Sequence, residues 1–122
     1  MKINTKATNI SLTPAITEYI EKKIDILNKF FGEDEEVLVS VEVGKITRHH
    51  KSGDVFRAEI KITAPRKDMY AAKEAEDLYA AIDEVKDEIA YKLSSKKKKA
   101  LHLLRRGGAK IKNLLKGFRK QK

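Results

Sequence analysis

The chain has 122 residues, enough for one ordinary domain. Hydrophobic residues make up 41% and charged residues 37%, which excludes a wholly disordered chain and predicts a soluble, folded one. The absence of cysteine excludes a disulfide framework and a cysteine-based zinc site. No apolar run reaches the roughly 20 residues of a membrane-spanning helix, and the first residues lack a signal-peptide pattern, so we expect a cytoplasmic protein.

The net charge of +9 is unevenly distributed along the chain. Residues 1–88 contain 14 basic and 18 acidic residues, a balance of −4, whereas residues 89–122 contain 13 basic and no acidic residues. A polycation of this length repels itself unless a polyanion accompanies it. The C-terminal part therefore predicts a polyanionic partner, and we favour RNA or DNA.

The first part of the chain predicts a strand followed by a helix. Residues 1–9 alternate apolar and polar side chains, the period of two that is typical of a half-buried strand. Thr13 then supplies an N-cap hydroxyl and Pro14 a suitable first helical residue. Apolar residues recur at spacings of 3 and 4, so we place a helix at 14–31 with Gly32 as its left-handed C-cap.

Two further strands are predicted where β-branched and other apolar residues alternate with polar ones. They cover residues 37–43 and 55–64, each with one inward face. The small polar residues 48–54 between them predict a protruding, positively charged hairpin loop. The residues expected to point inward are Val37, Val39, Val41, Val43, Phe56, Ala58, Ile60, Ile62 and Ala64.

A nine-residue repeat follows, in which residues 68–73 recur as residues 77–82. The second copy predicts a helix, because Asp77 is a suitable N-cap and apolar residues recur from Leu78 to Leu93 at spacings of 3 and 4. The first copy fits either a helix or a strand of small residues after Pro65, and the pattern leaves both open.

The C-terminal segment is basic and carries no continuation of the core stripe. Lys96–Lys99 occupy the turn where the next apolar residue would fall, and the pair Gly107-Gly108 predicts a break. Residues 109–120 form a basic amphipathic segment that we expect to be helical only when bound. We therefore divide the chain into a domain at 1–99 and a basic tail at 100–122.

Candidate catalytic and metal-binding residues are few. His49 and His50 are adjacent, and His102 lies far along the chain, so no metal-ligand spacing is present. No GxSxG motif and no phosphate-binding glycine loop occurs. Four carboxylates in the second helix are interpreted as offsetting the positive end of its dipole. They are Asp83, Glu84, Asp87 and Glu88. We expect no enzyme activity, no metal, no cofactor and no small-molecule substrate.

The basic residues carry the clearest functional signal. Lys92, Lys96 and Lys99 are spaced 4 and 3 apart and so share one side of the second helix. Only Tyr91 supplies an aromatic ring nearby, which favours contacts to phosphate and RNA shape over base stacking. An anionic membrane surface is the alternative partner of the lysine- and leucine-rich tail. The absence of tryptophan and the glycine pair that splits the apolar face count against it.

The order of elements and several residues resemble the ribosome hibernation promoting factor family, also called ribosome-associated inhibitor or protein Y. The resemblance covers residues 1–99 and rests chiefly on the string Asp77-Leu78-Tyr79-Ala80-Ala81-Ile82-Asp83. It rests also on Thr13, Lys23, Phe30-Phe31 and the strand at 37–43. It implies an α+β fold, β-α-β-β-β-α, in which a four-stranded sheet carries both helices on one face, like a double-stranded-RNA-binding domain. It also implies that the first copy of the repeat is the fourth strand.

The family binds the small ribosomal subunit between its head and body and covers the sites of messenger and transfer RNA. The resemblance implies contacts from basic residues of both helices, which by position are Lys23 and the lysines of 92–99. Glu88 and Tyr91 stand where the family commonly has Lys and Arg. We expect Lys86, Lys92 or the tail to substitute for them.

By length the chain is similar to the tailed short members of the family. We expect a translation inhibitor that acts by occlusion, a monomer when free, whose partners are the small ribosomal subunit and its RNA and not a membrane. A general structured-RNA-binding module is the alternative. The residues expected to contact ribosomal RNA are Lys23, Arg48, Lys51, Lys86, Lys92, Lys96, Lys97, Lys98, Lys99, Arg105, Arg106, Lys110 and Lys112.

Overall fold

Four strands and two helices follow one another in the predicted order β-α-β-β-β-α, with a short 3₁₀ helix after the first helix. The computed structural model describes residues 1–46, 53–65 and 68–106, and for residues 96–106 it describes the helical backbone alone. The elements are β1 (Lys2–Thr8), α1 (Pro14–Asp25), η1 (Ile26–Phe30), β2 (Leu38–Ile46), β3 (Val55–Thr63), β4 (Met69–Ala75) and α2 (Leu78–Arg106).

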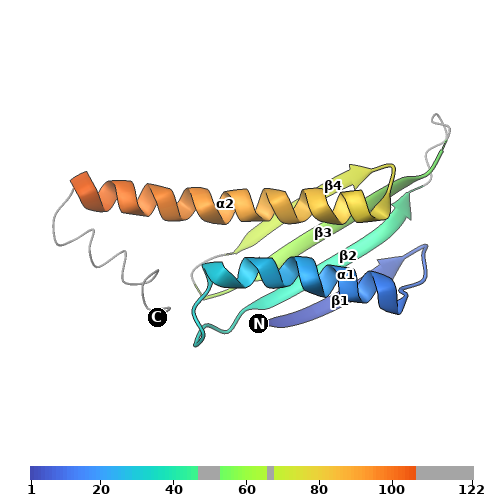
Figure 1. Ribbon diagram of the computed structural model, residues 1–122, viewed down its shortest axis with the longest axis horizontal. Helices are drawn as coiled ribbons and strands as arrows, with labels where there is room; N and C mark the ends of the chain where they lie inside the picture. Colours follow the sequence, from blue (N-terminus) through green and yellow to red (C-terminus); the bar gives the residue numbers. More distant parts are fainter. Residues whose placement is uncertain (47–52, 66–67, 107–122) are drawn as a thin grey trace.

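The strands form one sheet in the order β1-β2-β3-β4. β1 runs parallel to β2, as the α1 crossover between them requires, and the other two pairs are antiparallel. β2 and β3 pair from their ends at Ile46 and Val55, so these two strands are the arms of a hairpin. Both helices cover the same face of the sheet, and the other face is open (Figure 1). The expected architecture is confirmed.

The alternation read from the sequence correctly identifies the covered face of the sheet. Val39, Val41 and Val43 of β2 are buried, whereas Ser40 and Glu42 between them are only partly covered. The same pattern holds in β3 and in the apolar stripe of α2, which lies across β3 and β4. The largest fully buried side chains are Ile20, Ile24, Leu27, Ile60, Ile62, Ile82, Ile89, Val39, Val43 and Val85.

The two copies of the repeat adopt different structures. The first lies mainly in β4, where Met69 and Ala71 face the helices and pair with Ile62 and Ile60 of β3. The second begins α2, and Asp77 Oδ2 accepts a 3.0 Å hydrogen bond from the backbone of the first helical turn, as an N-cap should. Pairing with β3 therefore decides what the local sequence leaves open.

The first helix begins as predicted but ends earlier. Thr13 Oγ1 accepts a 3.2 Å hydrogen bond from the Ile16 amide, which confirms the N-cap. The α-helix stops at Asp25 and tightens into η1, and Phe31 is extended with φ −125° and ψ 151°. Gly32 does not have a positive φ, so its assignment as a left-handed C-cap is wrong. The tighter turn still buries the predicted apolar face, and the extended residue directs the chain towards β2.

α2 continues far beyond the body of the domain. Its last buried residue among those with described side chains is Leu93, yet the helix runs to Arg106, about 20 Å further at 1.5 Å per residue. Figure 1 shows this part extending past the sheet and α1. The predicted division after Lys99 falls inside α2 and stays a prediction. In the described ranges, neither helix combines the length and apolar composition needed to cross a bilayer.

Candidate nucleic-acid interface

Lys23, the basic residue expected to contact RNA from α1, lies in a polar cluster between the two helices. Its Nζ is 3.3 Å from Asp83 Oδ1 on α2 and 5.2 Å from the centre of the Tyr19 ring. The Tyr19 hydroxyl donates a 2.6 Å hydrogen bond to the same carboxylate oxygen, and its ring meets that of Tyr79 edge to face at 4.8 Å. The cluster places one cation between α1 and α2, beside a carboxylate.

The protonation states in this cluster follow from its contacts. The hydrogen bond to Asp83, helped by burial and by the charge of that carboxylate, raises the pKa of Tyr19 to about 12. Burial of the Asp83 carboxyl raises its pKa. The hydrogen bonds from Tyr19 and Lys23 and the charges of Lys23 and Lys86 lower the pKa by more than burial raises it. The net result is a pKa below the usual value, so Asp83 is ionised at neutral pH.

The two other predicted lysines with described side chains are also paired with acids. Lys86 forms an ion pair with Asp87, its neighbour on α2. Lys92 Nζ lies 3.8 Å from Glu88 Oε2, one turn earlier on α2, and donates a 2.9 Å hydrogen bond to the backbone oxygen of Tyr70. Two of the carboxylates of α2 that were interpreted as offsetting the helix dipole, Asp87 and Glu88, thus also serve as partners for its lysines.

Lys73 on β4 is a further cation beside α2, and the sequence patterns did not single it out. Its Nζ is 3.8 Å from Glu88 Oε1, so Glu88 contacts Lys73 with one oxygen and Lys92 with the other. The strand register places residue 73 on the helix-covered face of the sheet, at its edge, where a long side chain can reach α2. The position of Lys73 beside Glu88 could be recognised only once residues 69–75 were known to form a strand.

The remaining predicted basic residues are placed by backbone alone or not at all. Lys96, Lys97, Lys98, Lys99, Arg105 and Arg106 lie in the helical backbone of α2 beyond the body. Since positions 92, 96 and 99 are 4 and 3 residues apart, they fall on one side of that helix. Arg48, Lys51, Lys110 and Lys112 lie outside the described residues.

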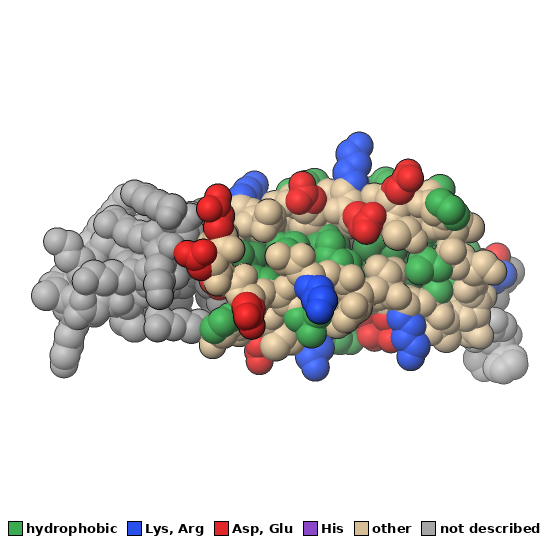
Figure 2. Space-filling model, turned by 90° about the horizontal axis from the view of Figure 1, so that it is seen from below, with side chains coloured by type: hydrophobic (Ala, Val, Ile, Leu, Met, Phe, Trp, Pro, Cys, Tyr) green, Lys and Arg blue, Asp and Glu red, His purple; other side chains and the backbone are tan. Residues whose placement is uncertain are grey.

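Acidic and basic side chains are interspersed over the described body. Figure 2 looks at the molecule from below and shows both kinds scattered, with a band of hydrophobic side chains between them. This mixture agrees with the balance of −4 for residues 1–88 and with the ion pairs of the lysines. On that face the described residues of the body present no broad basic surface, and the sequence places the excess of positive charge in residues 89–122.

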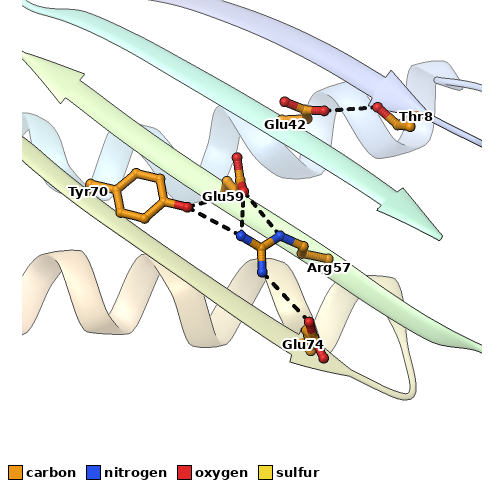
Figure 3. Close-up of polar contacts among 6 residues, drawn as sticks. All are labelled: Thr8, Glu42, Arg57, Glu59, Tyr70 and Glu74. Atoms are coloured by element: carbon orange, nitrogen blue, oxygen red, sulfur yellow. Dashed lines mark hydrogen bonds and ion pairs between the residues drawn. The ribbon is translucent and has the colours of Figure 1, made fainter. Parts of the chain in front are cut away.

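Polar side chains on the open face of the sheet form a hydrogen-bonded and ion-paired network around Arg57 (Figure 3). Arg57 Nε donates a 3.1 Å hydrogen bond to Glu59 Oε1, Nη2 lies 3.3 Å from Tyr70 Oη, and Nη1 lies 3.7 Å from Glu74 Oε2. The hydrogen bond to Glu59 outweighs the effect of burial and raises the pKa of Arg57. Arg57 is therefore engaged within the sheet.

A shallow hollow lies at one end of the same open face. It is lined in part by Thr8, Asn9, Glu42, Arg57 and Glu59. Both acids are already engaged, since the Thr8 hydroxyl donates a 2.9 Å hydrogen bond to Glu42 and Arg57 binds Glu59 (Figure 3). Within the described ranges, no three His, Cys, Asp or Glu side chains are grouped to hold a metal ion.

Comparison with known proteins places the fold and these residues in a family. The family described as "Sigma 54 modulation protein / S30EA ribosomal protein" matches residues 3–100. The chain belongs to this family. A protein of Escherichia coli K12 named ribosome hibernation promoting factor is 30% identical over 99 residues, which cover 81% of this chain and 96% of the relative. A Lactococcus lactis ribosome hibernation promotion factor is 31% identical, over 73% of this chain and 45% of the relative.

Two solved structures agree with the fold. The N-terminal domain of Thermus thermophilus Protein Y is 30% identical and superposes with a TM-score of 0.65, covering 76% of this chain and 96% of that one. A ribosomal subunit interface protein of Coxiella burnetii, 18% identical with a TM-score of 0.64, shares the fold. The predicted resemblance to the ribosome hibernation factors is confirmed, and with it the strand assignment of the first repeat.

In this S30EA family member, the two positions that depart from the expected basic pattern have distinct surroundings. Glu88 is the partner of Lys73 and Lys92. Tyr91 points away from the core and is 70% exposed, the highest value among the exposed large hydrophobic residues described. One position therefore carries an acid engaged by two lysines, and the other carries an accessible ring.

Proposed function

We propose that the chain binds the small ribosomal subunit, covers the sites of messenger and transfer RNA, and so inhibits translation in the cytoplasm without catalysing a reaction. The observation that carries the proposal is the form of α2. The helix is anchored in the core as far as Leu93 and then continues outward with four consecutive lysines, on the fold of a family with relatives named ribosome hibernation factors.

In this mechanism the body supplies shape and α2 supplies most of the charge. The two helices and the sheet form a rigid block that fills space which messenger and transfer RNA would otherwise occupy. Lys96–Lys99 and the following basic residues neutralise phosphates along the RNA, and release of counterions then makes the affinity depend on salt. Binding alone is sufficient for inhibition, so no catalytic group is needed.

In this mechanism, the lysines of the body exchange their carboxylate partners for RNA phosphates. Lys23 and Lys92 have side chains that are 25% and 41% exposed, and each is paired with an acid. Exposed ion pairs of this kind are worth only about 0 to 1 kcal/mol, so a phosphate at the same place can compete with the carboxylate. We infer that these lysines contact RNA only once the α2 segment has brought the body into position.

Co-sedimentation with purified ribosomal subunits tests the proposal. The protein should pellet with small subunits and bind them more tightly than large subunits or a random RNA duplex. Equal affinity for subunits and random duplex would instead identify a general structured-RNA-binding module. Failure to bind any of them would contradict both functions.

A matched pair of triple variants tests the role of α2 in the same assay. Replacing Lys96, Lys97 and Lys98 by Gln should weaken binding strongly and lower the salt dependence. The control replaces Lys2, Lys6 and Lys61 by Gln, since these exposed lysines alternate with residues of the covered face and so point to the open face. It removes the same charge and should change the affinity far less. Equal losses in the two variants would show that net charge alone matters.

A further inference from the structure

Two lysines converge on one carboxylate at the edge where β4 meets α2. Lys73 Nζ from β4 and Lys92 Nζ from α2 each lie 3.8 Å from a separate oxygen of Glu88. Two ammonium groups on different elements that face one carboxylate form a place suited to an anion with several oxygens. Glu88 at present fills that place with its own side chain.

The three side chains are accessible to solvent, and one of the lysines is also hydrogen-bonded to the backbone of β4. The side chains of Lys73 and Lys92 are each 41% exposed and that of Glu88 is 36% exposed, so an RNA backbone can approach all three. Lys92 Nζ is also tied by a 2.9 Å hydrogen bond to the backbone oxygen of Tyr70 on β4. The ammonium group of Lys92 would therefore stay at this edge if Glu88 turned away.

We propose that Glu88 occupies a phosphate site formed by Lys73 and Lys92, and that a phosphate of ribosomal RNA displaces it on binding. Glu88 thereby lowers the affinity of the body for RNA and makes engagement depend on the basic segment of α2. This inference rests on the proposed function and adds to it a named site and a residue that sets its affinity.

The distances favour displacement over a permanent ion pair. Both nitrogen–oxygen separations of 3.8 Å exceed the 2.7–2.9 Å of a charge-assisted hydrogen bond, so Glu88 holds each lysine loosely. A phosphodiester has the same single negative charge and can approach both ammonium groups from solvent without distorting the helix. The cost of binding is then the loss of two weak contacts of Glu88.

The test compares Glu88→Gln with Glu84→Gln. Glu84 lies one turn earlier on the same helix, is exposed, and has no ion pair among the described residues. Both variants remove one negative charge, but only the first frees Lys73 and Lys92. Affinity for small ribosomal subunits and for a short RNA duplex is measured over a range of salt concentrations, and thermal unfolding checks that each variant is folded.

We expect Glu88→Gln to bind about fivefold more tightly than Glu84→Gln at low salt, the gain available from releasing an exposed ion pair. The gain should shrink as the salt concentration rises, because salt weakens the ion pairs that Glu88 forms in the free protein. The double variant Lys73→Gln/Glu88→Gln should lose part of the gain. Equal affinities of the two single variants, or weaker binding by Glu88→Gln, would overturn the inference.

The two RNA probes separate the inference from the proposed function. If the wild-type protein fails to bind small subunits selectively, the proposed function fails, yet the duplex still compares Glu88→Gln with Glu84→Gln. If the protein binds subunits but the two variants behave alike on both probes, the function stands and the phosphate site is wrong.

Discussion

The Tyr19 hydroxyl of α1 donates a 2.6 Å hydrogen bond to Asp83 of α2, and this bond ties together the two helices that cover the sheet. Lys23 adds an ion pair to the same carboxylate oxygen from the next turn of α1. α1 also packs on the core through Ile20 and Ile24, which are fully buried, and the apolar stripe of α2 lies across β3 and β4. The polar contact therefore adds a specific tie between two helices that are each anchored in the core.

Replacing Tyr19 by Phe should destabilise the domain by about 1 kcal/mol, because it removes one hydrogen bond to a partly exposed carboxylate. The ring and its edge-to-face contact with Tyr79 are kept in this variant. Chemical denaturation monitored by circular dichroism gives the free energy of unfolding of both proteins.

Tyr79→Phe is the control for this prediction. It makes the same chemical change, but the Tyr79 hydroxyl has no hydrogen bond to another residue in the described part of the chain. Its free energy of unfolding should stay close to that of the wild type. A loss in Tyr79→Phe as large as that in Tyr19→Phe would contradict a specific role of the bond to Asp83.

The same bond predicts a loss of stability at alkaline pH. The pKa of Tyr19 is raised from 10.0 to about 12, so the folded state favours the protonated phenol. The stabilising contribution is complete below pH 10 and is lost as pH rises from 10 towards 12. The difference in unfolding free energy between wild type and Tyr19→Phe should shrink over that interval. A difference that stays constant would argue against the bond.

Asp83 predicts a loss of stability at acidic pH. Its pKa lies below the ordinary value of 3.8 even though burial acts in the opposite direction, because the contacts of Tyr19 and Lys23 favour the carboxylate. The contribution of the ion pair is therefore present above that pH and declines in more acidic solution. Asp83→Asn should flatten the acid limb of the stability curve.

Most of the sheet and the helix starts could be predicted because each depends on local pattern. Alternation identified the buried valines of β2, and Thr13 and Asp77 both cap the helices that they were expected to cap. The end of α1 and the structure of the first repeat could not be predicted from local pattern. They depend on packing with distant residues, such as the pairing of Met69 with Ile62.

The candidate site was less predictable than the fold. Runs of lysine are visible in a sequence, but the partners of Lys23 and Lys92 come from other elements or other turns and appear only in three dimensions. Lys73 was missed because its position beside Glu88 requires the strand register of β4. Charge patterns thus predict which segments bind, whereas the ion pairs that engage individual cations are visible only in the structure.

Gly44 marks the place where β1 and β2 approach too closely for a side chain. A Cβ at this position would lie 2.8 Å from the backbone oxygen of Thr8, its partner in the parallel register. Gly44→Ala should therefore destabilise the domain by about 1 to 3 kcal/mol, as overpacking does. Ser40→Ala, on the same face of β2, is the control and should cost much less. Thermal unfolding that leaves both variants alike would contradict this packing.

Truncation after Lys99 should leave the body folded. The last residue known to be buried in the core is Leu93, and residues 94–99 keep more than a turn of helix beyond it. Unfolding should stay cooperative, while affinity for ribosomal subunits falls because the basic residues beyond 99 are lost. Loss of cooperative unfolding in the truncated protein would instead show that the C-terminal segment packs on the body.

The most direct test of the account is competition with transfer RNA on purified small ribosomal subunits. Occlusion predicts that the protein and transfer RNA exclude each other, so that raising the concentration of one displaces the other and the sedimented subunits never carry both. Simultaneous binding of the protein and transfer RNA to the same subunits would contradict the account.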